Sequence, residues 1–192
     1  MILTKTIGSY PKPEFLKLPD WFQGDKGTDT ERPTADWKNA MSALGRNREE
    51  LIEKAVQEVI NDQINCGIDI VTDGEVRREN YIHHHCRYIN GIDFDYLTKK
   101  TARTGNYDCY LPTVISKVKF TEPFLDKEFQ INQKNSTKPV KITLPGPLTI
   151  KDTIADNQSL IHISEPTRRN PISNDVFCLQ KEHMSAQSTE LG

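Results

Sequence analysis

The sequence predicts an α/β fold with parallel strands, and three observations support this. Short runs rich in apolar and β-branched residues occupy 3–9, 68–72 and 140–145, and each ends in a polar or Gly/Pro segment. A longer amphipathic segment, 48–66, lies between the first two runs. A strand, a helix and a second strand in this order form a unit with parallel strands and a right-handed crossover. The carboxyl ends of such strands meet at one end of the sheet, where α/β proteins bind their ligands.

The first strand and the first helix have the clearest signals. The strand ends before residues 10–13, because this segment contains two prolines and proline cannot continue a central strand. Residues 14–46 are expected to form a long loop. Asn47 and Glu50 then have the spacing of a capping box, and Gly67 is expected to end the helix. The apolar residues of this helix recur at helical spacing: Leu51, Ile52, Ala55, Val56, Val59, Ile60 and Ile64.

The remaining elements alternate less regularly. Apolar residues at helical spacing predict a second helix over 77–90. Alternation over 114–120 predicts an exposed strand within an irregular excursion, 91–138. A short helix is expected over 121–129, and residues 148–155 start a third crossover helix after the third strand.

Composition and charge exclude several classes of protein. The chain has 192 residues, 35% of them hydrophobic, which suffices for one domain. Its formal net charge of −2 comes from interleaved acids and bases, so no basic face for nucleic acid is expected. No apolar run approaches the roughly 18 residues of a membrane helix, and neither a membrane partner nor a signal peptide is expected. The four cysteines have no CxxC spacing, which indicates the reducing cytoplasm.

Three segments at the predicted strand ends carry a family resemblance. They are residues 6–11 (TIGSYP), 67–78 (GIDIVTDGEVRR) and 142–149 (ITLPGPLT). In order and spacing they resemble the catalytic barrel of cobalamin-independent methionine synthase and its shorter archaeal-type relatives, within the uroporphyrinogen decarboxylase/methionine synthase-like superfamily. The resemblance implies that residues 1–157 form an incomplete TIM (β/α)8 barrel. The chain would supply the first three βα units, with the irregular excursion between strands 2 and 3.

The resemblance also implies a substrate site and an activity. In this family the segment after the first strand and the Glu after the second hold the amino-acid part of homocysteine, which implies Ile7, Gly8, Ser9 and Glu75 here. A carboxylate can pair with the substrate ammonium, and a backbone N–H and a serine hydroxyl can receive the substrate carboxylate. The implied activity is that of a 5-methyltetrahydropteroyltriglutamate–homocysteine S-methyltransferase, which belongs to methionine biosynthesis and binds a small thiol or amino acid. Two alternatives stay open: another thiol-alkylating or decarboxylating barrel of the superfamily, and a non-catalytic small-molecule-binding protein.

The family's methyl transfer implies a zinc-bound thiolate, because coordination makes the nucleophile available at neutral pH. The zinc ligands of the family lie on later strands, in a His-x-Cys, a Glu and a further Cys, and Cys178 fits no such pattern. No catalytic or metal-binding residue is therefore predicted in this chain, which is expected to be inactive as written. The methyl donor stays unassigned, because Asp108 and Thr153 stand where folate-using members have an Arg and a Trp.

Three other groups of residues suggest sites but have simpler interpretations. Residues 83–86 (HHHC) suggest a metal, but successive residues of a helix point about 100° apart and do not converge on one ion. Arg77 and Arg78 fit either an anion site near the strand ends or a solvated, salt-bridged pair. Asp73 and Glu75 are too close together in a turn to face one another as the two carboxylates of a glycosidase.

Residues 158–192 differ in character from the rest of the chain. They resemble the translation of a sequencing-library adapter. Their apolar residues follow no helical or alternating period, so they offer no consistent face for burial. We therefore expect a disordered tail that is not biological sequence.

Overall fold

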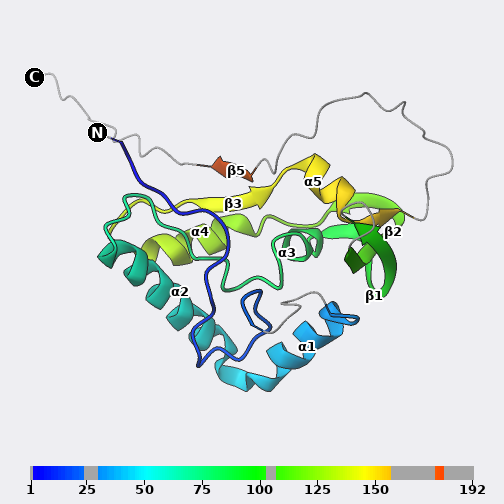
Figure 1. Ribbon diagram of the computed structural model, residues 1–192, viewed down its shortest axis with the longest axis horizontal. Helices are drawn as coiled ribbons and strands as arrows, with labels where there is room; N and C mark the ends of the chain where they lie inside the picture. Colours follow the sequence, from blue (N-terminus) through cyan, green and yellow to red (C-terminus); the bar gives the residue numbers. More distant parts are fainter. Residues whose placement is uncertain (1, 24–29, 103–106, 157–175, 180–192) are drawn as a thin grey trace, which may run out of the picture.

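Figure 1 shows the computed structural model, which describes residues 2–23, 30–102, 107–156 and 176–179. Within these ranges, none of the helices is long and apolar enough to cross a membrane. The elements in chain order are α1 (Pro33–Ala43), the 3-10 helix η1 (Gly45–Asn47), α2 (Arg48–Asn65), α3 (His83–Cys86), β1 (Ile89–Ala102), β2 (Tyr107–Phe120), α4 (Leu125–Lys134), β3 (Ile142–Pro145), α5 (Pro147–Asp152), β4 (Ala155–Asp156) and β5 (Val176–Leu179).

Three strand segments lie side by side and parallel, in chain order. Lys5 forms a parallel bridge with Ile70, and Val71 forms one with Val140. The Lys141 N–H donates to the Val71 carbonyl over 3.0 Å, which continues the second pairing. The third segment contains β3, whereas the first two pair through isolated bridges. The predicted parallel order of the three segments is confirmed.

The apolar face of α2 covers these segments. Its buried residues form one core with residues of the strand segments: Ile52, Ala55, Val56, Val59 and Ile60 from α2, with Val71 and Val140. Leu51 is half-buried at the edge of this core. Full burial of an aliphatic side chain contributes about 1.5–3 kcal/mol relative to exposure, so this contact is a principal stabilisation of the fold. The predicted apolar stripe is confirmed for these five residues of α2, whereas Leu51 and Ile64 are only partly buried.

The start of α2 differs from the prediction. Asn47 makes no side-chain hydrogen bond to the helix, so the predicted capping box with Glu50 is wrong. A capping side chain works from an extended backbone, whereas Asn47 ends η1 with φ −87° and ψ 11°. The helix therefore continues directly from the 3-10 turn. Its end agrees with the prediction, because Asn65 is its last residue and Gly67 has φ +82°.

Residues 14–46 contain a helix that the sequence analysis did not predict. α1 begins with Pro33, which suits the first turn of a helix because its fixed φ is already helical. Trp37 is buried and joins the same core as α2. α1 also contacts the hairpin, because the Thr34 hydroxyl donates to the Phe94 carbonyl of β1 over 2.9 Å.

The helix predicted over 77–90 is much shorter than expected. α3 spans only His83–Cys86. The side-chain oxygen of Asn80 accepts hydrogen bonds from the backbone N–H groups of Ile82 (2.9 Å) and His83 (2.7 Å). Such a side chain competes with helical hydrogen bonding in its own neighbourhood, so the helix begins only after Asn80.

The predicted excursion is a long antiparallel hairpin. β1 and β2 pair from Ile89 with Phe120 to Ala102 with Tyr107, with two interruptions of register. β2 includes the predicted strand at 114–120 and extends it toward the N-terminus, and β4 joins it in parallel. Figure 1 shows β1 and β2 curled together at the right of the view, whereas α2 lies at the left.

The last two predicted helices are also shifted. α4 begins at Leu125 instead of residue 121, because Pro123 restricts the backbone of the residue before it to extended conformations. α5 ends at Asp152, so it fills only part of the predicted helix over 148–155.

β5 lies in the segment expected to be a disordered tail. It pairs antiparallel with β3, from Ile142 with Leu179 to Pro145 with Val176. The edge of a strand offers unpaired N–H and C=O groups to any second strand, which accounts for this pairing. The expectation of an irregular tail is therefore wrong for these four residues, while 157–175 and 180–192 lie outside the described residues.

Candidate functional site

The three strand ends bring their polar side chains together at Glu75. The Ser9 hydroxyl, after the first segment, donates to Glu75 Oε2 over 2.9 Å. The Thr143 hydroxyl, in β3, donates to Glu75 Oε1 over 2.8 Å. Ser9 and Glu75 were both predicted as substrate-binding residues, and the structure places them in direct contact. Thr143 was not predicted, although it is a polar residue within an apolar strand that ends at the same edge.

A tight turn holds Glu75 in this position. The Tyr10 N–H donates to the Gly74 carbonyl over 2.8 Å, which joins the exit of the first segment to the turn after the second. Gly74 has φ +62°, and a Cβ there would lie 2.6 Å from the Tyr10 Cβ. Glu75 itself has φ +59°, an uncommon conformation for a residue with a side chain. Its N–H donates to Asp73 Oδ1 over 3.0 Å, which helps to hold the strained backbone.

Arg78 completes this group of side chains, which we call the Glu75 cluster: Ser9, Glu75, Arg78 and Thr143. Its side chain is 1% exposed, and its Nη2 donates to the Thr143 carbonyl over 2.8 Å. Its Nη1 lies 3.2 Å from Thr143 Oγ1 and 3.3 Å from Glu75 Oε1. Arg77 instead lies 3.5 Å from Glu49. Of the two interpretations of this arginine pair, the structure therefore favours ion pairing within the protein.

The other predicted site residues contribute less through their side chains. Ile7 is 66% exposed, so its side chain lies outside the core. Gly8 is also exposed, with φ +85° and open space where a Cβ would be. Any role of these two residues rests on their backbone groups.

Lys12 places a positive charge near the cluster. Burial lowers the pKa of its ammonium group, and the carboxylates of Asp20 and Glu75 act in the opposite direction. Its Nζ lies 5.9 Å from the centre of the Trp37 ring, a distance typical of a cation–π contact. Lys12 was not among the residues predicted for the site.

The histidine segment binds three different partners. His83 Nδ1 lies 3.4 Å from Glu79, His84 Nε2 lies 2.6 Å from Glu128, and His85 Nδ1 lies 2.7 Å from the Tyr81 carbonyl. The described part of the chain contains no group of three or more His, Cys, Asp or Glu side chains able to hold a metal.

His84 and Cys86 have the His-x-Cys spacing of the family's zinc ligands, but their surroundings do not fit a metal site. Cys86 is fully buried, and burial raises the pKa of its thiol to about 12, whereas zinc binds the thiolate. The His84 ring is already bound to Glu128. The residues described here therefore do not fit zinc.

The two positions that bear on the methyl donor make local contacts. Asp108 lies 2.7 Å from Lys99 Nζ, and hydrogen bonds from Lys99 and Thr101 lower the pKa of its carboxyl group. The Thr153 hydroxyl, just after α5, donates to the Thr149 carbonyl within the helix over 2.6 Å. Neither contact is with the Glu75 cluster.

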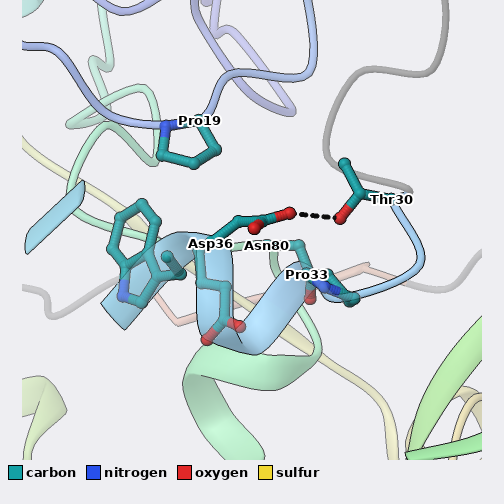
Figure 2. Close-up of a pocket in the computed structure, with 7 residues that line it drawn as sticks. Pro19, Thr30, Pro33, Asp36 and Asn80 are labelled. Atoms are coloured by element: carbon teal, nitrogen blue, oxygen red, sulfur yellow. Dashed lines mark hydrogen bonds between the residues drawn. The ribbon is translucent and has the colours of Figure 1, made fainter. Parts of the chain in front are cut away.

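Two cavities lie outside the cluster. The first, of about 240 Å³, is shown in Figure 2, where Thr30 donates to Asp36 over 2.7 Å; it is lined by Pro19, Thr30, Pro33, Asp36, Trp37, Glu79 and Asn80. The second, of about 360 Å³, lies between α2, α3 and α4. Neither Ser9 nor Glu75 lines either of these two cavities.

Comparison with known proteins supports the resemblance seen in the motifs. Residues 2–166 match the family of the cobalamin-independent synthase catalytic domain. The chain belongs to this family. The methionine synthases of Saccharolobus solfataricus and Sulfurisphaera tokodaii are each 31% identical to it, over 153 and 150 residues. These matches cover 79% and 78% of this chain but only 41% and 39% of the relatives.

A solved structure of the same family has a similar fold. The B12-independent methionine synthase of Shewanella sp. W3-18-1, in complex with selenomethionine, aligns with a TM-score of 0.62 at 29% identity. The alignment covers 82% of this chain and 42% of that protein. The family match runs beyond residue 157, where the sequence analysis puts the domain boundary, and that boundary stays a prediction.

Proposed function

We propose that this chain forms the first three βα units of a TIM (β/α)8 barrel that transfers a methyl group to homocysteine in methionine biosynthesis. The observation that carries the proposal is the contact between Ser9 and Glu75 across two strand ends, in a member of the cobalamin-independent methionine synthase family. The Shewanella relative binds selenomethionine, an amino acid, which supports an amino-acid ligand here. The two alternative functions have no comparable support.

The geometry suggests how the amino-acid part is held. Glu75 accepts the substrate ammonium, which takes over the hydrogen bond that the Ser9 hydroxyl now makes to Oε2. The freed hydroxyl and the backbone N–H groups near Gly8 then receive the substrate carboxylate, since a hydroxyl can donate to either partner. Lys12 adds a positive charge close enough to interact electrostatically with Glu75.

The chemical step itself needs parts that the described residues do not supply. Zinc, which the family generally uses, provides a thiolate nucleophile at neutral pH. No group of described residues fits that ion, so we expect the chain to be inactive alone. We propose a cytoplasmic protein with a small-molecule partner and with neither nucleic acid nor membrane partners; Asp108 and Thr153 leave the methyl donor unassigned.

Binding of L-methionine, the product, tests the site directly. We expect the 192-residue chain to bind it in isothermal titration calorimetry, and Glu75→Gln to weaken binding roughly tenfold or more, because an ion pair is lost. Ser9→Ala should weaken it less. Glu58→Gln, on the exposed face of α2, is the matched control and should bind normally. Equal affinity in Glu75→Gln and Glu58→Gln would show that Glu75 does not hold the ligand.

Activity requires the rest of the barrel. Residues 1–157 joined to the remaining part of the S. solfataricus methionine synthase should form methionine from homocysteine when a methyl donor is supplied. The same chimera with Glu75→Gln should lose most of this activity. A folded chimera whose activity does not depend on Glu75 would count against the proposed substrate site.

A further inference from the structure

Glu75 receives its hydrogen bonds through a directed chain of donors. Arg78 Nη1 donates to Thr143 Oγ1 over 3.2 Å, and the Thr143 hydroxyl then donates to Glu75 Oε1 over 2.8 Å. A guanidinium can only donate, so the direction of the first bond is fixed. With its lone pair engaged, the Thr143 hydroxyl proton is available for Glu75. The polarity of this chain suits a charged carboxylate at its end.

The two carboxylate oxygens of Glu75 differ in how many partners they have. Oε1 has two partners, Thr143 at 2.8 Å and Arg78 at 3.3 Å. For Oε2, the structure gives a hydrogen bond from Ser9 alone among the described residues. Each carboxylate oxygen has about two acceptor sites, so Oε1 is saturated and Oε2 retains capacity. A ligand ammonium should therefore meet Oε2.

Arg78 also ties the third strand end to the turn after the second. Its Nη2 donates to the Thr143 carbonyl over 2.8 Å, while its own backbone N–H donates to the Glu75 carbonyl over 2.9 Å. Glu75 has a left-handed backbone, and a strained residue keeps such a conformation only where its surroundings over-determine it. Arg78 and Thr143 are the buried side chains that do so for its carboxylate.

We propose that Thr143 and Arg78 are positioning residues that saturate Glu75 Oε1 and turn Oε2 toward the ammonium group of the amino-acid ligand. This inference rests on the proposed function and deepens it. These two side chains touch Glu75 and not the ligand, so they set the recognition of the ammonium group without contributing to the binding of the thioether or the carboxylate.

Two ligands that differ only in the ammonium group test this inference. L-methionine carries it, and 4-(methylthio)butanoate does not. The ratio of their dissociation constants, measured by calorimetry on the 192-residue chain, reports recognition of the ammonium alone. Thr143→Val keeps the shape of the side chain and removes the hydroxyl, so we expect it to reduce this ratio roughly tenfold. Thr143→Ser restores the hydroxyl and should restore the preference.

Arg78→Met and a double variant provide the second measurement. Arg78→Met should also reduce the preference for L-methionine, but adding it to Glu75→Gln should reduce the preference no further than Glu75→Gln alone, because Arg78 acts only through the Glu75 carboxylate. A structural role alone would weaken both ligands by the same factor, and that result in Thr143→Val would overturn the inference. Failure of the unaltered chain to prefer L-methionine would overturn the proposed function, and this inference with it.

Discussion

Gly74 and Gly67 both have a left-handed backbone, but their surroundings differ. They therefore distinguish two reasons why a position requires glycine: a positive φ, and a lack of space for a Cβ atom. Both have positive φ, +62° and +82°. A Cβ at Gly74 would lie 2.6 Å from Tyr10 and 2.7 Å from Val59, whereas a Cβ at Gly67 would meet nothing within 4 Å. Of these two glycines, Gly74 alone combines backbone strain with a close approach.

We predict that Gly74→Ala destabilises the protein more than Gly67→Ala. Both variants incur roughly 1–2 kcal/mol for a left-handed alanine, and Gly74→Ala adds about 1–3 kcal/mol for overpacking. Urea unfolding of the two variants would measure the difference. Equal losses would mean that the turn can move away from Tyr10.

His85 gives the folded chain a predictable response to acid. Burial, and after it the nearby Arg78 cation, lowers the pKa of His85 to about 3, from an ordinary value near 6.5. Between these values the unfolded chain binds a proton that the folded chain does not, so the free energy of unfolding falls as pH falls. The contribution of this residue is fully present above pH 6.5 and is lost progressively below it.

We predict that His85→Phe removes this part of the pH dependence. Between pH 7.5 and pH 5 the free energy of unfolding should fall by about 2 kcal/mol more in the unaltered chain than in the variant. The ring of phenylalanine can keep the edge contact with Phe124, which lies 5.5 Å from the His85 ring. Identical pH dependence in the two proteins would show that His85 is protonated in the fold.

Ser9 and Glu75 could be predicted because each follows a strand within a motif, and parallel strands end at one edge of a sheet. Arg78 could not be assigned in the same way. The sequence shows two adjacent arginines, and only the path of the turn decides that Arg78 enters the core while Arg77 faces Glu49. Thr143 was missed because its role depends on a partner 68 residues away.

At the scale of elements, α2 is held to the strand end by one buried amide. Gln63 is fully buried; its Nε2 donates to the Thr72 carbonyl over 2.7 Å, and the Thr72 N–H donates to its Oε1 over 3.0 Å. The Gln63 amide thus pairs with both backbone groups of Thr72, as a neighbouring strand would. Thr72 is the residue just before the Asp73–Glu75 turn. It therefore connects the packing of the helix to the geometry of the site.

We predict that Gln63→Leu lowers the free energy of unfolding by roughly 2–4 kcal/mol, because two buried backbone groups of Thr72 lose their partner. Gln57→Leu, on the exposed face of the same helix, is the matched control and should change it by no more than about 0.5 kcal/mol. Urea unfolding at neutral pH measures both. Similar values for the two variants would mean that water satisfies Thr72.

The elements that could be predicted are those whose signal is local and repeated. The stripe of α2 spans many positions at one period, so it survives any single exception. α1 was not predicted and α3 was predicted too long, because a single residue determines where each helix begins. Pro33 starts α1, and Asn80 delays the start of α3. The capping box failed because η1 leads into α2 without an extended residue.

At the scale of the whole molecule, the strand that pairs with the free edge of β3 lies next to the site, because Thr143 is part of β3. The chain covers 42% of the Shewanella relative, so more than half of that protein lies outside the alignment. In this structure β5 pairs with β3 at that edge. Because the Lys141 N–H is bonded to Val71, the N–H groups of Ile142 and Leu144 point the other way, toward β5.

Deleting residues 158–192 separates the role of β5 from that of the parallel segments. We predict that the amides of Ile142 and Leu144 then exchange with solvent roughly tenfold faster or more, because their partners are removed. The Lys141 amide should keep its protection, since its acceptor, Val71, remains. Affinity for L-methionine should not change, because Ser9, Glu75 and Thr143 are held by residues before 157. Loss of binding, or equal acceleration at Lys141, would instead show that residues beyond 157 are an integral part of the site.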